Sequence, residues 1–230
     1  MNTPLVILPG MMCDARLFAA QIAVFWDSRP VIIPPMTGHD SVADVAANVL
    51  RMAPEKFALA GLSMGGIVAM ELMRQAPDRV THLALMDTNA KSEPPKIAAR
   101  RDPQIARVQA GGLQDVMRDE LMPYYVADGP LADEALEVCM TMADSLGPDV
   151  FADQSRALQT RPDQQDTLRQ ITVPTLILCG EADQLCPPHL HELMHDLTPG
   201  SILKIIKGAG HLPTLEQPQA TNEALSQWLT

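Results

Sequence analysis

FALAGLSMGGIVAMEL, residues 57–72, is the stretch that decides the fold of this chain. It begins with an apolar run without strict alternation, which is typical of a buried strand in a parallel sheet. A helical pattern follows at 64–76, and Ser63 stands between the two, in a Gly-x-Ser-x-Gly motif with Gly61 and Gly65. Such a tight turn strains the serine backbone and lifts its hydroxyl above the strand end. The glycines fit because side chains would collide across the turn.

Further apolar runs, with helical patterns between them, extend this unit into a doubly wound α/β sheet. Expected strands occupy residues 5–9, 30–34, 57–61, 82–87, 175–180 and 202–208. Helical patterns lie at 14–26, 41–52, 64–76 and 188–197, and a final helix runs to Trp228. Alternation of this kind implies a mostly parallel sheet with right-handed crossovers. Residues 89–165 break the rhythm with helical periodicity alone, so we expect an inserted helical cap there and a core formed by 1–88 and 166–230.

Composition restricts the class of protein. A chain of 230 residues, 47% hydrophobic and 20% charged, fits one domain with an insertion. The net charge of −11 disfavours a nucleic-acid partner, whose phosphates need a basic face. No stretch approaches the ~20 apolar residues of a membrane span, and the start MNTPLVILPGMM lacks the basic region of a signal peptide. Four cysteines without C-x-x-C pairing fit reduced thiols, so we expect a cytoplasmic protein without a membrane partner.

A base and an acid for Ser63 lie later in the chain. His211, in GAGHLPTLEQP, follows the last expected strand, and Asp183, in CGEADQLCPP, follows the strand before it. A serine nucleophile needs a base, and the base needs an orienting acid. All three residues lie at carboxyl ends of expected strands, so we predict a catalytic triad of Ser63, Asp183 and His211. Asp87, in LALMDTNA, also follows a strand and is the alternative acid.

With these motifs the chain resembles the α/β-hydrolase fold superfamily over nearly its whole length, as a capped single-domain serine hydrolase of the carboxylesterase type. The resemblance makes the turn at Ser63 a nucleophile elbow. In that family the loop after the first strand shown here usually reads His-Gly, and the next backbone N–H helps to form the oxyanion hole. Here LPGMMCD keeps Gly10 and has Pro9 in the His position. The resemblance therefore implies an oxyanion hole formed by the N–H groups of Met11 and Met64. The two family strands that normally come first are not found, so we expect about six strands.

The cap should roof Ser63, so its apolar side chains would shape the substrate pocket. The candidate contacts are methionines and tyrosines, each with core packing as the alternative reading: Met12, Met122, Tyr124, Tyr125 and Met140. Methionine is flexible and polarizable, which predicts a mainly apolar and adaptable pocket.

The segment 91–107 is basic, with five Lys/Arg against two Asp/Glu, in an acidic chain. It is either a solvated helix face or a surface that attracts an anionic substrate or an acidic carrier domain. Capped hydrolases that resemble this chain and cleave carrier-bound esters use cap arginines in that way. The resemblance therefore implies Arg100, Arg101 and Arg107 as candidate contacts.

HELMH, at residues 191–195, is a competing motif because it matches the H-E-x-x-H pattern of zinc metalloproteases. His191 and His195 would bind the metal, Glu192 would be the base, and Glu216 is a possible third ligand. The helix is expected as a crossover between two strands, however, and no other metalloprotease feature surrounds it. A solvated helix face with incidental histidines is the favoured interpretation.

These observations predict a serine hydrolase that cleaves a carboxylic ester or thioester of a small to medium, mainly apolar substrate. Catalysis would pass through an acyl-enzyme on Ser63, and no cofactor or metal is implied. The same triad on this fold also serves C–C bond hydrolysis and lactone opening, which fold analogy does not separate. A zinc peptidase and a non-catalytic hydrolase-fold receptor are the remaining alternatives.

Overall fold

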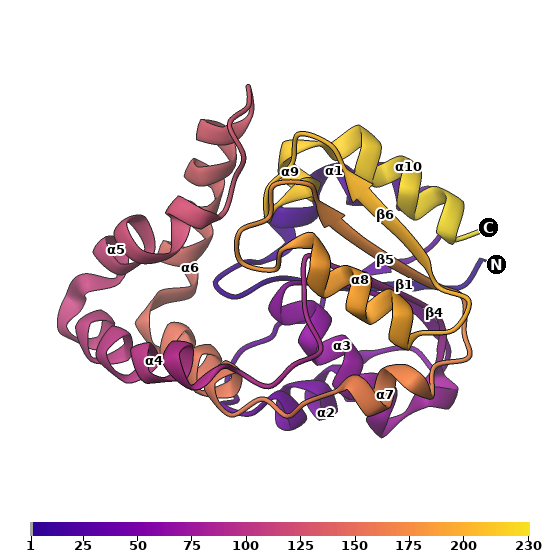
Figure 1. Ribbon diagram of the computed structural model, residues 1–230, viewed down its shortest axis with the longest axis horizontal. Helices are drawn as coiled ribbons and strands as arrows, with labels where there is room; N and C mark the ends of the chain where they lie inside the picture. The colour runs from indigo at the N-terminus through magenta and orange to yellow at the C-terminus, as the bar shows by residue number, and fades with distance from the viewer. Residues whose placement is uncertain (1) are drawn as a thin grey trace.

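The computed structural model describes residues 2–230, and a single parallel sheet runs through its centre (Figure 1). The strands are β1 (Leu5–Leu8), β2 (Val31–Ile32), β3 (Phe57–Leu62), β4 (Val80–Met86), β5 (Thr175–Gly180) and β6 (Ile202–Ile206). Their order is β2-β1-β3-β4-β5-β6, and each neighbouring pair is parallel. The expected six-stranded, doubly wound α/β fold is thus confirmed. β2 is shorter than expected because prolines at 30 and 34 bound it, and proline cannot donate to a sheet.

Helices connect the strands and account for most of the remaining chain. They are α1 (Ala19–Phe25), α2 (Val42–Met52), α3 (Met64–Gln75), α4 (Pro95–Arg107), α5 (Leu113–Val116), α6 (Ala132–Gln159), α7 (Gln165–Arg169), α8 (Pro188–Leu197), α9 (Pro213–Glu216) and α10 (Pro218–Trp228). Short turns of 3-10 or π geometry are η1 (Ala15–Phe18), η2 (Pro77–Arg79), η3 (Val108–Gly112), η4 (Met117–Leu121) and η5 (Met122–Tyr124). Within residues 2–230, no helix has both the length and the apolar character needed to cross a bilayer.

Helices cover both faces of the sheet, which explains why its strands are apolar without alternation. α2, α3 and α8 pack on one face, and α1 and α10 lie on the other (Figure 1). Along β1, Val6 and Leu8 belong to the apolar core with α2 and α3, whereas Leu5 and Ile7 belong to the core on the opposite side. Every residue of β1, β3 and β5 is buried. The loops at the carboxyl ends of these strands therefore start from fixed positions.

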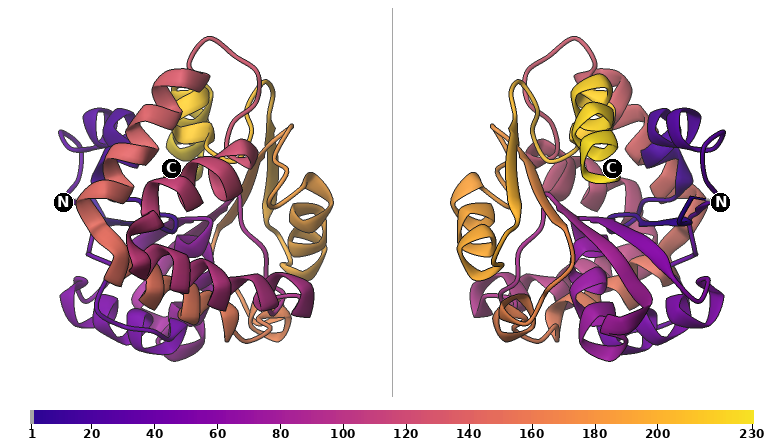
Figure 2. Two further views of the ribbon diagram at one scale, coloured as in Figure 1. Left: turned by 90° about the vertical axis from the view of Figure 1, so that its left-hand side faces the viewer. Right: turned by 90° about the vertical axis from the view of Figure 1, so that its right-hand side faces the viewer.

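Residues 89–165, called the helical segment below, contain helices and turns and no strand. α4, α5 and α6 stand beside the sheet in Figure 1 and in front of it in the left view of Figure 2. α6 is kinked at Gly147, which has a φ of 81° and precedes Pro148. Met142 and Phe151 of α6 are buried in the same apolar core as Leu5. The helical segment and the sheet thus share one core.

Candidate active site

Ser63 is held in a strained turn between β3 and α3. Its φ of 55° lies in the left-handed region, which non-glycine residues rarely adopt. The Ser63 N–H donates to Met86 O at 2.9 Å, and the Ser63 carbonyl accepts from Thr88 Oγ1 at 2.7 Å. A Cβ at Gly61 would run into the Gly65 backbone, and one at Gly65 would run into the Leu8 carbonyl. The turn can therefore close only with glycine at both positions.

Three non-glycine residues among those described have positive φ, and each begins a loop near the carboxyl end of a central strand. Met12 follows β1, Ser63 follows β3, and Asp87 follows β4. Strain of this kind persists only where the surrounding structure enforces it, and it concentrates at functional sites. The backbone alone thus marks this edge of the sheet as the site.

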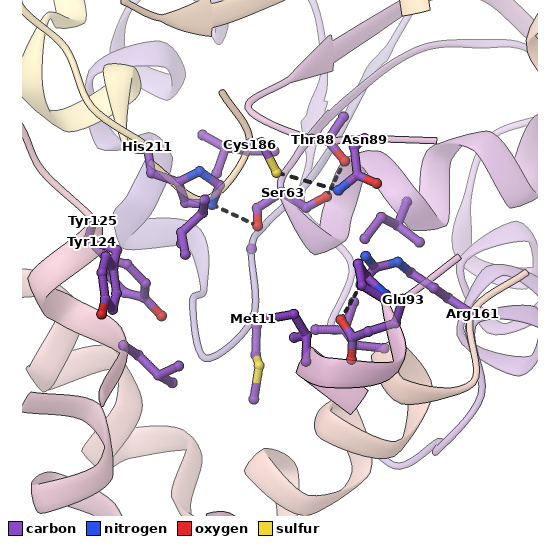
Figure 3. A pocket seen from close by; sticks show the side chains of 18 of the residues that line it. Met11, Ser63, Thr88, Asn89, Glu93, Tyr124, Tyr125, Arg161, Cys186 and His211 are labelled. Atoms are coloured by element: carbon purple, nitrogen blue, oxygen red, sulfur yellow. Dashed lines mark hydrogen bonds and ion pairs between the residues drawn. The ribbon is translucent and has the colours of Figure 1, made fainter. Parts of the chain in front are cut away.

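The structure brings Ser63, His211 and Asp183 together in one line of hydrogen bonds (Figure 3 shows the serine and histidine). His211 Nε2 lies 2.9 Å from Ser63 Oγ, and His211 Nδ1 lies 2.9 Å from Asp183 Oδ2. Asp183 Oδ1 accepts from the N–H groups of Leu185 at 2.8 Å and Cys186 at 3.0 Å. Both the histidine and the aspartate are 3% exposed. A carboxylate placed in this way can orient the imidazole so that Nε2 accepts the serine proton.

Electrostatics keep the Asp183 carboxylate charged in spite of its burial. Burial alone would raise the pKa of Asp183, because it disfavours the charged form. The charge of His211 and the hydrogen bonds from His211, Cys186 and Leu185 outweigh burial and lower the pKa below its usual value. The ionised form is the one that can accept a hydrogen bond from His211 Nδ1.

Asp87, the alternative acid, lies at the end of the neighbouring strand and is fully buried. Its Oδ1 accepts from the Gly180 N–H at 2.8 Å, and among residues 2–230 its Oδ2 has no hydrogen-bond partner. Burial, with the nearby charge of Asp183, raises its pKa well above the usual value. The histidine is therefore paired with Asp183, and Asp87 ties β4 to β5 instead.

The two N–H groups expected to form an oxyanion hole lack protein acceptors among the described residues. Neither the Met11 N–H nor the Met64 N–H has a protein acceptor among residues 2–230. Met64 is the first residue of α3, where a helix presents unpaired N–H groups and the positive end of its dipole. Gly10 lies against Ser63, since a Cβ there would be 3.5 Å from Ser63 Cβ. This places the Met11 loop beside the nucleophile.

Side chains from distant elements hold these loops, and no local sequence pattern marks these side chains. The Met12 N–H donates to Gln154 Oε1 of α6 at 2.8 Å, which supports the loop that has Pro9 in place of histidine. Glu216 Oε2 accepts from the Gly210 N–H at 2.8 Å and from the Ala127 N–H at 2.7 Å. The loop that carries the histidine is thereby tied to the helical segment.

A cavity of about 470 Å³ opens above Ser63, between the strand ends and the helical segment. Ser63, His211 and Met11 line it from the core, and Tyr124 and Tyr125 line it from the helical segment. In Figure 3 the two tyrosines lie on the histidine side of Ser63. The Ser63 hydroxyl therefore faces a partly open, mainly apolar cavity.

Comparison with known proteins settles the family. A model of the alpha/beta hydrolase family matches residues 5–224. The chain belongs to this family. It is accordingly an enzyme of the hydrolase class. A thermophilic esterase from Thermogutta terrifontis, solved with malate bound, is 30% identical, with a TM-score of 0.92 over 100% of this chain and 90% of that one.

Two further relatives are more distant. A pimeloyl-[acyl-carrier protein] methyl ester esterase from Aeromonas hydrophila is 24% identical over 97% of this chain and 88% of its own length. An enol-lactonase from Burkholderia xenovorans LB400 is 20% identical, with a TM-score of 0.87 over 100% of this chain and 92% of that one. At that identity the lactonase shows the shared fold alone.

In this hydrolase, the three methionines expected in the pocket lie elsewhere, and that expectation is corrected. Tyr124 and Tyr125 line the cavity, but Met12, Met122 and Met140 do not. Met12 is fully buried and Met122 is 8% exposed, both within the apolar core, and Met140 packs against that core. Methionine spacing could not separate a core contact from a cavity contact, because apolar side chains of the helical segment pack into the core and also line the cavity.

The arginines of the basic segment 91–107 differ in whether they line the cavity. Arg100 and Arg101 line the cavity, whereas Arg107 forms an ion pair with Glu120. Arg101 is nearly buried and Arg100 is exposed, so of these two only Arg100 is available to a large partner outside the cavity. Arg161, which lies outside the segment singled out in the sequence, also lines the cavity.

The histidines of the HELMH motif have separate hydrogen-bond partners. His191 Nε2 accepts from the Thr88 N–H at 3.0 Å, and His195 Nδ1 lies 2.7 Å from Ser201 Oγ. Burial lowers the pKa of His191 to about 4. Glu216, the possible third ligand, holds backbone N–H groups as described above. Among the described residues these side chains do not gather into a group with metal-ligand spacing.

Proposed function

We propose that this hydrolase is a serine esterase in which Ser63 is the nucleophile, His211 the base and Asp183 the orienting acid. The observation that carries the proposal is the pair of 2.9 Å contacts that link Asp183 Oδ2, the imidazole and Ser63 Oγ. The strained serine turn and the two unpaired N–H groups beside it support the same assignment.

The mechanism follows from these positions. Ser63 Oγ attacks the ester carbonyl as its proton passes to His211 Nε2, and the Met11 and Met64 N–H groups bind the oxyanion, at about 3–4 kcal/mol per donor. The protonated histidine then gives its proton to the leaving alcohol or thiol. Water, activated by the same nitrogen, hydrolyses the acyl-enzyme and releases the acid.

The substrate class rests on the cavity and the relatives. A cavity of about 470 Å³ accommodates a small to medium ester or thioester beneath the helical segment, which acts as the cap. The Thermogutta terrifontis esterase and the Aeromonas hydrophila methyl ester esterase support ester hydrolysis. The malate held by the former supports a cavity that accepts organic acids. Exposed Arg100 is the contact that an acidic carrier would meet.

Labelling with a fluorophosphonate, together with turnover of p-nitrophenyl esters, tests the proposal. Ser63→Ala should lose the label and at least about 10⁴-fold in kcat, because the triad acts as a unit. Ser92→Ala is the matched control, since Ser92 also lines the cavity but has no histidine partner among the described residues. Turnover that survives in Ser63→Ala and is abolished by a chelator would overturn the assignment and favour metal chemistry.

A further inference from the structure

The charged groups that line the cavity have a sign opposite to that of the whole protein. The chain carries a net charge of −11. Four lysine or arginine side chains line the cavity against two glutamates: Lys91, Arg100, Arg101 and Arg161, with Glu93 and Glu120. A concentration of one sign of charge in a concave, partly apolar site attracts ligands of the other sign.

The innermost of these groups form a buried cluster with an unbalanced charge. Glu93 accepts from Arg101 Nε at 2.8 Å and Nη2 at 3.0 Å, and from Arg161 Nη1 at 2.6 Å. The three side chains are 11% exposed or less. Two guanidinium groups thus share one carboxylate, which leaves one positive charge without a partner inside the cluster. A buried cation of this kind is costly unless an anion joins it.

Donors remain free on both arginines. Among residues 2–230, Arg161 Nη2 has no hydrogen-bond partner, and Arg101 Nη1 has only Met11 Sδ, at 3.5 Å. Thioether sulfur is a weak acceptor. Guanidinium N–H groups of two arginines that face one cavity match the two oxygens of a carboxylate.

The cluster lies within reach of the reacting carbonyl. Figure 3 shows Arg161 and Glu93 on one side of Ser63, and Tyr124 and Tyr125 on the other. Met11 connects Ser63 with the cluster, because it follows Gly10, which lies against Ser63, and its sulfur contacts Arg101. One methionine side chain plus that contact spans about 10 Å at most, given bond lengths near 1.5 Å. A short acyl chain can therefore bridge the oxyanion hole and the arginines.

We propose that Arg101 and Arg161 form a carboxylate subsite, and that the substrates are half-esters of short dicarboxylic acids. The free carboxylate binds the two guanidinium groups while the ester carbonyl lies at Ser63. Hydrolysis breaks the acyl C–O bond, the alcohol leaves with the proton from His211, and water supplies the hydroxyl of the new acid. The inference rests on the proposed ester hydrolysis and names its substrate.

A pair of isosteric esters tests the subsite directly. Monomethyl glutarate carries the carboxylate, and the methyl ester of glutaramic acid carries a neutral amide in its place. Wild-type kcat/KM should favour the carboxylate by about tenfold or more, mainly through KM, as expected for hydrogen bonds to a charged group. Arg161→Gln and Arg101→Gln should bring the ratio close to one. Arg118→Gln, an exposed arginine of the same helical segment, should leave it unchanged.

Binding separates this inference from the proposed function. Glutarate should bind Ser63→Ala in calorimetry, and the added Arg161→Gln substitution should abolish that binding whether or not the protein is an esterase. Equal turnover of both esters by the wild type would overturn the subsite and leave the esterase intact. Absent labelling and turnover, with glutarate still bound, would overturn the esterase alone. If Arg161→Gln does not fold, Arg161→Lys, which keeps the charge but loses the planar fork, should give an intermediate ratio.

Discussion

The strand ends that carry Ser63 and the helical segment that faces them use glycine for different physical reasons. At the turn, a Cβ on Gly65 would run into the carbonyl of Leu8, so the residue is fixed by close backbone contact. In the helical segment, Gly111 has a φ of 96° and no atom within 4 Å of the position a Cβ would take. Close packing therefore requires glycine at position 65, whereas the local backbone conformation favours it at position 111.

The two sides of the cavity also differ in what holds their lining groups in place. On the core side, backbone atoms and buried carboxylates hold the serine, the histidine and the two candidate oxyanion N–H groups. On the other side, side chains such as Tyr124 and Arg101 reach the cavity from a segment that contains a π turn at η3 and a kink in α6. We infer that the core fixes the chemistry and the helical segment selects the substrate.

The largest effect is expected where the core fixes the imidazole. Asp183→Asn should lower kcat about 10³–10⁴-fold with little change in KM, because an amide cannot hold the same histidine tautomer as a carboxylate. Steady-state kinetics with a p-nitrophenyl ester measures it. Asp87→Asn is the matched control, since that side chain hydrogen-bonds to Gly180 rather than to the histidine. If the two variants lose activity in the reverse order, the acid has been assigned to the wrong strand.

Close packing at the turn predicts the next effect. Gly65→Ala should lower the free energy of unfolding by about 2–4 kcal/mol, because the new methyl group meets backbone that cannot move without shifting β1. It should also reduce kcat, since the same shift displaces Met11. Urea unfolding and ester turnover measure the two consequences. A variant as stable as the wild type would show that the backbone around residue 65 can adapt to a side chain, and that close packing does not require glycine there.

Sequence reasoning succeeded where short-range rules apply. The strand, turn and helix around Ser63, and the strand ends that carry Asp183 and His211, follow from apolar runs and glycine spacing, so these residues could be placed together. It failed where a residue's role depends on which way a helix faces. Met122 and Tyr124 are two positions apart, yet the first packs into the core and the second lines the cavity. Gln154 contacts the core loop at Met12, and Arg161 contacts Glu93 within the helical segment; both contacts span large sequence separations, and no local pattern marks them.

A smaller effect is expected when Asp87, the buried acid that the proposed mechanism does not use, is replaced. The pKa of Asp87 is raised in the folded protein, so the native state holds its proton more tightly than the unfolded chain. Its contribution to stability is therefore full below the unfolded pKa of about 3.9 and is lost as the pH rises toward the folded pKa. Asp87→Asn, which stays neutral and can still accept from Gly180, should be more stable than the wild type at pH 8 but not at pH 4.

Thermal unfolding at the two pH values measures this difference. The gain at pH 8 is expected on the order of 2–4 °C for a domain of this size. A gain of equal size at pH 4 would mean that packing rather than ionisation is responsible.

The smallest effect is expected in the helical segment. Gly111→Ala places a methyl group in open space, so its cost comes only from the positive φ, about 1 kcal/mol. Activity on p-nitrophenyl esters should stay within about twofold of the wild type, because a strained turn η3 can relax without moving the strand ends. Urea unfolding of Gly111→Ala and Gly65→Ala, measured side by side, compares the two stability costs in one protein. If the two alanines cost the same, packing constrains the helical segment as tightly as the turn, and substrate selection would have to lie in the side chains alone.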